Sequence, residues 1–322
     1  MTHYLSLLVH EQPSVVRDQI ENFSRWAPKL RVVVHVSPSA SFSPQSLEEQ
    51  LGVRDSARGA IVNPAQHATS WSWNGGDRVP AIFRAHVENL RVMLERGDAQ
   101  TISFASSNDL LVRPGLITAS HGLKTRWNRV PIGRNFGWYW RDAALQFLRD
   151  FDIAVVNSIH SQVEGTTYPA EWVKSVFAVL EGAASVAGGF PLEEVLLPSL
   201  ASRDGLHPEA HPFTFSEVHR GDYAVSRVTQ LVGRREGRQP LLPTTWARQV
   251  VRQAALWRQI RPLSVEDVTR VRAETLPDRD LRLSAGMDRM PIYSRSDLFG
   301  VKRVARSMAD PLRLHIRGLL AE

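Results

Sequence analysis

The sequence predicts an α/β protein built on a mostly parallel sheet. Short apolar runs at residues 4–10 and 30–36 flank a segment, 13–26, whose apolar side chains recur at close to helical spacing. Strand, helix and strand in this order form a βαβ unit with a right-handed crossover. The alternation that predicts helices packed on a parallel sheet then continues through a strand at 59–63, a helix at 79–95 and a strand at 101–105.

The second half of the chain is predicted to be richer in helices. Residues 201–245 and 275–303 hold many turn-forming residues and are expected to be irregular. No repeat or low-complexity linker divides the chain, so we expect one compact unit, with a main part at 1–245 and a C-terminal extension at 246–322 that packs on it. Further helices are predicted at 138–149, 169–184, 192–200, 246–260, 265–272 and 311–320, and a strand at 153–158.

The composition excludes several classes of protein. The chain has 322 residues, 43% of them hydrophobic and 22% charged, which is ordinary for a folded domain, and it has no cysteine. Disulfides, a thiol nucleophile and cysteine-ligated zinc are therefore excluded. No apolar run reaches the roughly 20 residues that a membrane-spanning helix needs. The first residues do not resemble a signal peptide, so we expect a cytoplasmic protein.

The net charge of +6, carried mostly by arginine, favours an anionic partner. A phosphorylated small molecule, an anionic membrane surface contacted from the side, and nucleic acid all fit this charge. The sequence lacks a zinc finger, an aromatic RNA-binding strand and a clear helix-turn-helix, which argues against nucleic acid. An arginine-rich but otherwise ordinary surface would give the same charge.

The usual nucleotide and hydrolase motifs are missing. The sequence holds no Gly-x-Gly-x-x-Gly after the first strand, no Walker A motif, no His-Glu-x-x-His and no Gly-x-Ser-x-Gly. Among the eleven histidines, His207 and His211 come nearest to paired ligand spacing, but they lie among prolines. A metalloenzyme with histidine ligands is therefore not indicated.

Small polar residues follow the strand predicted at 101–105. In open α/β sheets, ligands bind at the carboxyl ends of the strands, which makes Ser107, Asn108 and Asp109 candidates for contacting substrate hydroxyls. A plain turn that uses Asp109 as a turn residue would look the same. Asp109 is the one carboxylate in this stretch, whereas Mg²⁺ or Mn²⁺ prefers more oxygen ligands. His10, at the end of the first strand, would lie at the same edge, near the base or ribose of a nucleotide.

The order of the segments resembles the core-2/I-branching glycosyltransferase family. The opening HYLSLLVHEQPSVVRDQIENF followed by LRVVVHVSPS is similar to the family's first strand, helix and strand, with Ser37 in place of an aspartate. The block HVENLRVMLERGDAQTISFASSNDLLVRP resembles the family's helix and strand that end in small polar residues and an aspartate. The resemblance implies a GT-A-type fold, inversion at the anomeric centre, and basic side chains rather than a required metal ion at the diphosphate.

Two later segments carry the roles that this resemblance implies. PLEEVLLPSLA resembles the segment that holds the family's catalytic base, which falls on Glu194, and SDLFGVKRV resembles the segment whose lysine supports the diphosphate, which falls on Lys302. Glu194 would equally suit the first turn of a helix as a purely stabilising acid. The family also uses an arginine about two dozen residues before the lysine, for which the candidates are Arg279, Arg282 and Arg289.

The chemistry of sugar transfer defines the remaining candidates. The leaving diphosphate needs a cation or a cluster of basic side chains, and Lys302, Arg303 and Arg306 form such a cluster in the sequence, although a solvated basic face would look alike. Gln162 and Glu164 lie in the segment that corresponds to the family's acceptor-binding region, with Glu164 as second choice for the base. Trp138 is a candidate platform for a sugar ring.

These observations predict an inverting glycosyltransferase. It would move a sugar from a nucleotide-diphosphate donor, a UDP-sugar above all, to a saccharide hydroxyl in the synthesis of a bacterial surface polysaccharide. On this prediction residues 1–245 bind donor and acceptor, and 246–322 close the diphosphate site. Two alternatives stay open: a metal-dependent enzyme of the same fold that uses Asp109 with Mg²⁺ or Mn²⁺, and a basic nucleic-acid-binding protein without enzymatic activity.

Overall fold

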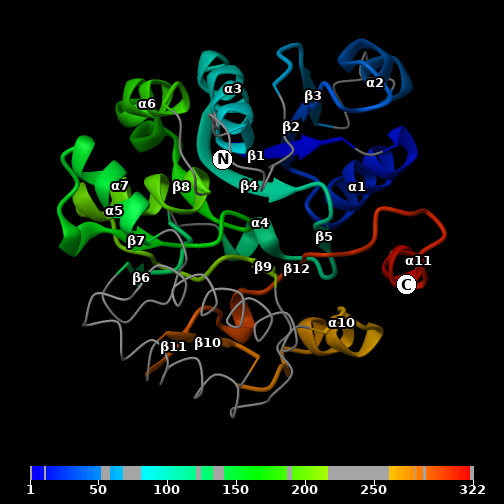
Figure 1. Cartoon of the computed structure of the whole chain (residues 1–322). Coiled ribbons are helices and arrows are strands. Elements are labelled where there is room, and N and C mark those ends of the chain that lie inside the picture. Colours follow the sequence, from blue (N-terminus) through cyan, green and yellow to red (C-terminus); the bar gives the residue numbers. More distant parts are fainter. Residues whose placement is uncertain are drawn as a thin grey trace, which may run out of the picture.

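A computed structural model of the chain confirms the α/β prediction (Figure 1). A mostly parallel central sheet is covered by helices on both faces. The structure describes residues 2–10, 12–51, 59–67, 81–120, 125–132, 141–186, 191–216, 261–278, 280–285 and 288–319.

The central sheet has five strands in the order β3-β2-β1-β4-β8. The first four are mutually parallel, while β8 runs antiparallel to β4. Strands β1, β2 and β4 are buried along most of their length, and β2 in particular is an almost unbroken run of β-branched residues, as expected for a sheet covered on both faces. The strands are β1 (Thr2–Val9), β2 (Leu30–Val36), β3 (Ala60–Asn63), β4 (Ala99–Ser106) and β8 (Thr167–Pro169).

Two hydrophobic cores lie on opposite faces of this sheet. Alternate residues of a strand point to opposite faces, so Phe104 joins the core under α3 (Ala81–Glu95) and α6 (Ala170–Ala184), while Ala105 joins the core under α1 (Pro13–Trp26) (Figure 1). Helix α1 begins with a proline at its first position, where the missing N–H costs nothing.

The rest of the described chain forms three small sheets and further helices, and the sheet that contains β5 directly follows the turn after β4. A third hydrophobic core, with Phe215 and Val301 at its centre, joins α10 and α11 to these strands. The small sheets are β5 (Leu110–Leu111) with β12 (Gly300–Val301) and β9 (Thr214–Phe215), β6 (Val130–Pro131) with β7 (Ile159–His160), and the hairpin β10 (Arg282–Ala285) and β11 (Asp288–Pro291). The remaining helices and 3-10 turns are α2 (Pro44–Leu51), α4 (Leu116–Ala119), α5 (Arg141–Asp150), η2 (Val155–Asn157), η3 (Leu192–Glu194), α7 (Leu196–Arg203), α10 (Val265–Arg272), η5 (Arg295–Asp297) and α11 (Pro311–Gly318).

The predicted strand at 153–158 is wrong. The chain forms the 3-10 turn η2 there, and the strand β7 begins only at Ile159. Val155 and Val156 are 58% and 77% exposed. The two valines therefore lie on the surface, although Ile153 before them is buried, and within the described residues no strand pairs with 153–158.

The single helix predicted at 192–200 is divided into η3 and α7. A proline ring clashes with the carbonyl of the residue four positions earlier in a continuous helix, and for Pro198 that residue is Glu194. Helix α7 therefore starts at Leu196, which leaves Pro198 in the first turn. The carbonyl of Glu194 instead accepts a hydrogen bond from the Ser161 N–H at 2.9 Å. The helix predicted at 246–260 lies outside the described residues.

In the part of the chain that the structure describes, every helix is too short or too polar to cross a lipid bilayer.

Candidate functional site

The turn after β4 is closed by Asp109. Its Oδ2 accepts a hydrogen bond from the Ser106 N–H at 2.9 Å and its Oδ1 accepts one from the Ser106 hydroxyl at 2.9 Å. Asp109 is 2% exposed. Asp109 therefore acts as a turn residue, and the turn holds its carboxylate, buried, at the carboxyl end of the central strand β4.

Lys302 lies beside this turn and forms an ion pair with Glu164. Strand β12 brings Lys302 there by pairing with β5, directly after the turn, and the Lys302 N–H donates to the Phe215 carbonyl at 2.8 Å. Glu164 comes from the loop between β7 and β8, and its side chain is 8% exposed. Residues about 140 positions apart in the sequence thus form one partly buried charge pair.

The charges of this cluster act strongly on one another. Burial, and the repulsion from Glu164, raise the pKa of Asp109 to about 7, against the opposing effect of Lys302. Burial lowers the pKa of Lys302, but the neighbouring carboxylates of Glu164, Asp109 and Glu194 outweigh it, so the net pKa of the ammonium is raised. Lys302 is therefore protonated at neutral pH. The charge of Glu194 has the smallest of these effects on Lys302.

Glu193 and Glu194 occupy the 3-10 turn η3 in different surroundings. Glu194 Oε2 lies 2.9 Å from His160 Nε2, and its side chain is 27% exposed. Glu193 is 7% exposed, and burial, followed by the repulsion from Glu194, raises its pKa to about 8. At neutral pH Glu193 keeps its proton, which leaves Glu194 as the partly exposed carboxyl of the two.

Gln162 is a supporting residue of the loop that carries Glu164. Its Nε2 donates to the carbonyls of Glu164 and Thr214, both at 2.7 Å. Its Oε1 accepts hydrogen bonds from the hydroxyls of Ser216 and Tyr293. Both the nitrogen and the oxygen of the Gln162 amide are thus hydrogen-bonded within the protein. Its role as a sugar ligand stays a prediction.

Residues 302–306, which we call the strap, run along the 106–109 turn. The Val304 N–H donates to the Asn108 carbonyl at 3.2 Å. The guanidinium of Arg306 donates to the Ser107 hydroxyl through Nε at 3.2 Å and Nη2 at 3.0 Å. Arg303 is exposed on the strap. The basic cluster predicted from the sequence therefore borders the strand-end turn.

The other predicted residues are placed as follows. His10 directly follows β1 and is partly exposed at the carboxyl end of the central sheet. Arg282 lies in the β10–β11 hairpin, as does Arg289. Arg279 and Trp138 lie outside the described residues.

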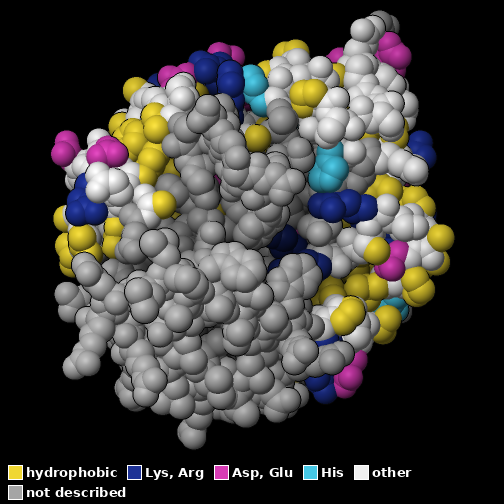
Figure 2. All heavy atoms as spheres, in the orientation of Figure 1, with side chains coloured by type: hydrophobic (Ala, Val, Ile, Leu, Met, Phe, Trp, Pro, Cys, Tyr) yellow, Lys and Arg dark blue, Asp and Glu magenta, His cyan; other side chains and the backbone are white. Residues whose placement is uncertain are grey.

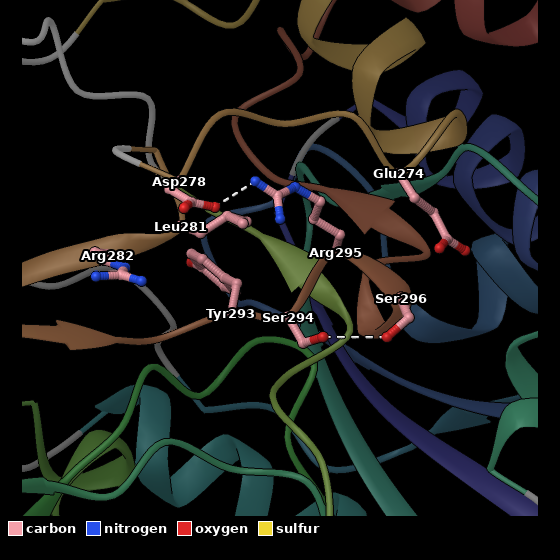
Figure 3. Close-up of a pocket in the computed structure, with 8 residues that line it drawn as sticks. All are labelled: Glu274, Asp278, Leu281, Arg282, Tyr293, Ser294, Arg295 and Ser296. Atoms are coloured by element: carbon pink, nitrogen blue, oxygen red, sulfur yellow. Dashed lines mark hydrogen bonds and ion pairs between the residues drawn. The ribbon is translucent and has the colours of Figure 1, made fainter.

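Arg282 lines a pocket of about 440 Å³ rather than the Lys302 cluster (Figure 3). Arg295 crosses the pocket wall to form an ion pair with Asp278, and its Nε donates to the Leu276 carbonyl at 2.7 Å. The Tyr293 side chain lies at the base of the same pocket and reaches Gln162 through its hydroxyl. One hydrogen bond, from the Tyr293 hydroxyl to Gln162, thus connects the pocket to the loop that carries Glu164.

A divalent cation at Asp109 would have to displace existing contacts. Both carboxylate oxygens accept hydrogen bonds from Ser106. Within the described ranges, no three His, Asp or Glu side chains are grouped so that they could hold a metal ion. The metal-dependent alternative therefore finds no preformed ligand set in these residues.

Three functional candidates were missed by the sequence analysis. His160 begins the HSQVEG stretch and contacts Glu194, so the signal was present two residues before Gln162. Glu193 lies next to the predicted base in the sequence, and it interacts with the charges of Glu164 and Lys302 as well as with Glu194. Tyr293 had no local signal, since only the fold brings it to Gln162.

The surface around the strap is basic. Figure 2 shows Lys and Arg side chains gathered beside a hollow near the middle of the face, over the region where Figure 1 places the end of β4 and β5. A hollow with cationic walls concentrates anionic ligands.

The sequence matches no family model and no curated protein. Similar solved structures include a mannosyltransferase from Pyrobaculum calidifontis in complex with GDP-Man and Mn²⁺, at 9% identity and a TM-score of 0.31, over 54% of this chain and 46% of that one. This chain thus spans less than half the length of that enzyme.

An active-site variant of LgtC is similar over 99% of this chain and 95% of its own, at 10% identity and a TM-score of 0.40. Glucosyl-3-phosphoglycerate synthase from Mycobacterium tuberculosis, solved with Mn²⁺, UDP and phosphoglyceric acid, is similar over 65% of this chain and 81% of its own, at 14% identity and a TM-score of 0.30. All three likenesses are distant, with identities of 9%, 10% and 14%.

Proposed function

We propose that this protein is an inverting glycosyltransferase that uses a nucleotide-diphosphate sugar, a UDP-sugar above all, and transfers the sugar to a saccharide hydroxyl. The observation that carries the proposal is the ion pair of Lys302 with Glu164 at the carboxyl end of β4, in the segment whose first residues, His160 and Ser161, contact Glu194. Sugar transfer with inversion needs one base and one centre of positive charge at a single cleft. The order of motifs along the sequence supports the same class.

Glu194 is the proposed catalytic base. Its carboxylate would take the proton of the acceptor hydroxyl while the hydroxyl oxygen attacks the anomeric carbon. The bond between that carbon and the diphosphate oxygen breaks in the same step, and the nucleotide leaves with the electron pair. The hydrogen-bond contact of His160 with Glu194 Oε2, at 2.9 Å, supports this role because it fixes the orientation of the carboxylate.

Lys302 is the proposed charge centre for the leaving diphosphate. Its raised pKa keeps the ammonium protonated at physiological pH. Arg303 and Arg306 extend the positive charge along the strap, and one of the arginines predicted earlier, Arg279, Arg282 or Arg289, would assist. The ion pair of Lys302 with Glu164 also argues against Glu164 as the base, because that carboxylate is already engaged by the ammonium.

Acceptor and donor hydroxyls would be bound around the same cluster. We assign Ser107, Asn108, Gln162, Glu164 and Trp138 to sugar hydroxyls and rings, and His10 with Asp109 to the donor. The GT-A type and the synthesis of a bacterial surface polysaccharide, with contact to an anionic membrane surface, belong to this proposal through the resemblance alone.

A thermal-shift screen against nucleotide sugars tests the proposal. One UDP-sugar should raise the Tm selectively, because a ligand that binds only the folded state stabilises it by mass action. A panel in which no nucleoside diphosphate or nucleotide sugar changes the Tm would contradict the proposed class.

Metal dependence is tested on the same protein. We expect transfer activity to survive EDTA, since basic side chains border the site and Asp109 is already engaged by Ser106. Activity that EDTA abolishes and Mn²⁺ restores would instead establish the metal-dependent alternative at Asp109.

A further inference from the structure

Helix α1 buries polar side chains on the side that faces the candidate site. Asp18, Gln19 and Asn22 are 7%, 1% and 3% exposed. A helix that packs on a sheet normally buries an apolar stripe, and buried polar groups are kept only where they find hydrogen-bond partners. The hydrogen-bond partners of these three residues therefore show which segments this face of α1 holds in place.

Gln19 and Asn22 hold the chain on both sides of Asp109. Gln19 Nε2 donates to the carbonyls of Ser106 and Asp109, both at 2.8 Å. Asn22 Nδ2 donates to the Leu111 carbonyl at 2.9 Å, and its Oδ1 accepts from the Leu111 N–H at 2.7 Å. The backbone of the turn and of β5 is thereby fixed to α1.

Asp18, the third of these residues, contacts the C-terminal helix α11. It forms a buried ion pair with Arg313, whose side chain is fully buried, and its Oδ1 lies 3.0 Å from Arg317 Nε. Arg313 Nε in turn donates to the carbonyl of Ala305 at 3.0 Å. Ala305 belongs to the strap, so Asp18 reaches the strap through one arginine.

We propose that Asp18, Gln19 and Asn22 form a positioning face that fixes the Asp109 turn and the Lys302 strap at the spacing a nucleotide-diphosphate donor requires. This inference rests on the proposed function for the identity of the donor. The two stretches of chain held by α1, 106–111 and 305–317, lie far apart in the sequence. They include the turn and part of the strap, which border the Lys302 cluster. Supporting residues of this kind hold the groups that contact a ligand in place.

The Asp18→Asn variant tests the positioning face. It keeps the shape of the side chain but removes the charge that holds Arg313 and, through it, Ala305. We expect the dissociation constant for UDP and the donor KM to rise about tenfold, with kcat at saturating donor changed less than about twofold. Hydrogen exchange measured by mass spectrometry on the ligand-free protein should become faster in peptides that contain the Val304 amide.

Asp267→Asn is the matched control. Asp267 is also a buried aspartate paired with an arginine, but among the described residues its side chain bonds to Arg261 and Ser264 at the start of α10. We expect this variant to lose a comparable amount of thermal stability while UDP affinity and exchange at Val304 stay as in the parent. If Asp18→Asn does not fold, Gln19→Met, which removes both donors of a neutral side chain, should weaken UDP binding in the same way.

The outcomes separate the inference from the proposed function. Parent protein that binds no nucleoside diphosphate overturns the proposed function. Unchanged exchange at Val304 in Asp18→Asn, or a UDP affinity that falls no more than in Asp267→Asn at equal loss of Tm, overturns the positioning face.

Discussion

Two adjacent carboxyls, Glu193 and Glu194, lie in different surroundings. The buried one keeps its proton at neutral pH, while the partly exposed one contacts His160. The resemblance selected Glu194, and the structure adds a physical reason for the choice. A base must be unprotonated and reach the acceptor, and Glu194 is the more exposed of the two.

Glu194→Gln should lower the transfer rate about 10²- to 10⁴-fold, the usual contribution of a general base. UDP affinity should stay within about twofold, because the residue acts on the acceptor. Glu193→Gln is the matched control, since glutamine imitates the protonated acid, and it should keep most of the activity at pH 7. Steady-state rates and calorimetric titration of UDP measure both, and a fully active Glu194→Gln enzyme would contradict the assignment.

Glu193 also gives the protein a specific dependence of stability on pH. Its pKa rises from 4.5 in the unfolded chain to about 8 in the folded one, so between these values the folded state holds a proton that the unfolded state has lost. Raising the pH through this window therefore favours unfolding, by about 1.4 kcal/mol for each pH unit crossed. Urea unfolding at pH 5.5, 7 and 8.5 should show a smaller decline for Glu193→Gln than for the parent. Equal declines would show that Glu193 does not titrate in this range.

At the scale of elements, the loop that carries Glu164 depends on a close backbone approach at Gly165. Its φ is +79°, and a Cβ added there would lie 2.4 Å from the Thr214 nitrogen and 2.7 Å from the Phe213 nitrogen. The loop is thereby locked against β9, next to the strap.

Gly165→Ala should destabilise the protein by about 3 kcal/mol or more, because the new methyl group meets backbone atoms that cannot move away independently. Gly97→Ala is the control: its φ is +71° but no atom lies within 4 Å of the added Cβ, so only the conformational cost of about 1 kcal/mol applies. Denaturant unfolding compares the two. Equal losses would mean that the contact with β9 does not constrain the loop.

The elements also show what the sequence could and could not predict. The apolar periodicity placed β1, α1, β2, α3, β4, α6 and α10 correctly, since burial against one sheet dictates that pattern. The same periodicity predicted a strand at 153–158, where two exposed valines form part of a 3-10 turn instead. It also predicted one helix at 192–200, whereas α7 starts only at Leu196 because of Pro198. The buried polar face of α1 could not be predicted from the sequence, because the residues that it bonds to lie about 90 and 300 positions further along the chain. The roles of Glu194 and Lys302 stay predictions, although the fold brings both to one cluster.

For the whole molecule, the net charge of +6 also fits the alternative function, a nucleic-acid-binding protein. A nucleic-acid-binding protein would retard DNA or RNA in a gel shift, with affinity falling steeply as salt rises. We expect no specific retardation at moderate salt, because the sequence lacks a zinc finger, an aromatic RNA-binding strand and a clear helix-turn-helix. Tight binding of DNA or RNA that weakens steeply as salt rises would favour the nucleic-acid-binding alternative.

Calorimetric titration of UDP into two matched variants tests the central claim, that Lys302 is the charge centre for the donor. Glu164→Gln leaves Lys302 without its carboxylate and should bind UDP at least as tightly as the parent. Adding Lys302→Ala to it, so that no buried charge is left unpaired, should weaken UDP binding roughly 10- to 100-fold, as the loss of a charge-assisted contact does. Equal affinities in the two variants would contradict the account.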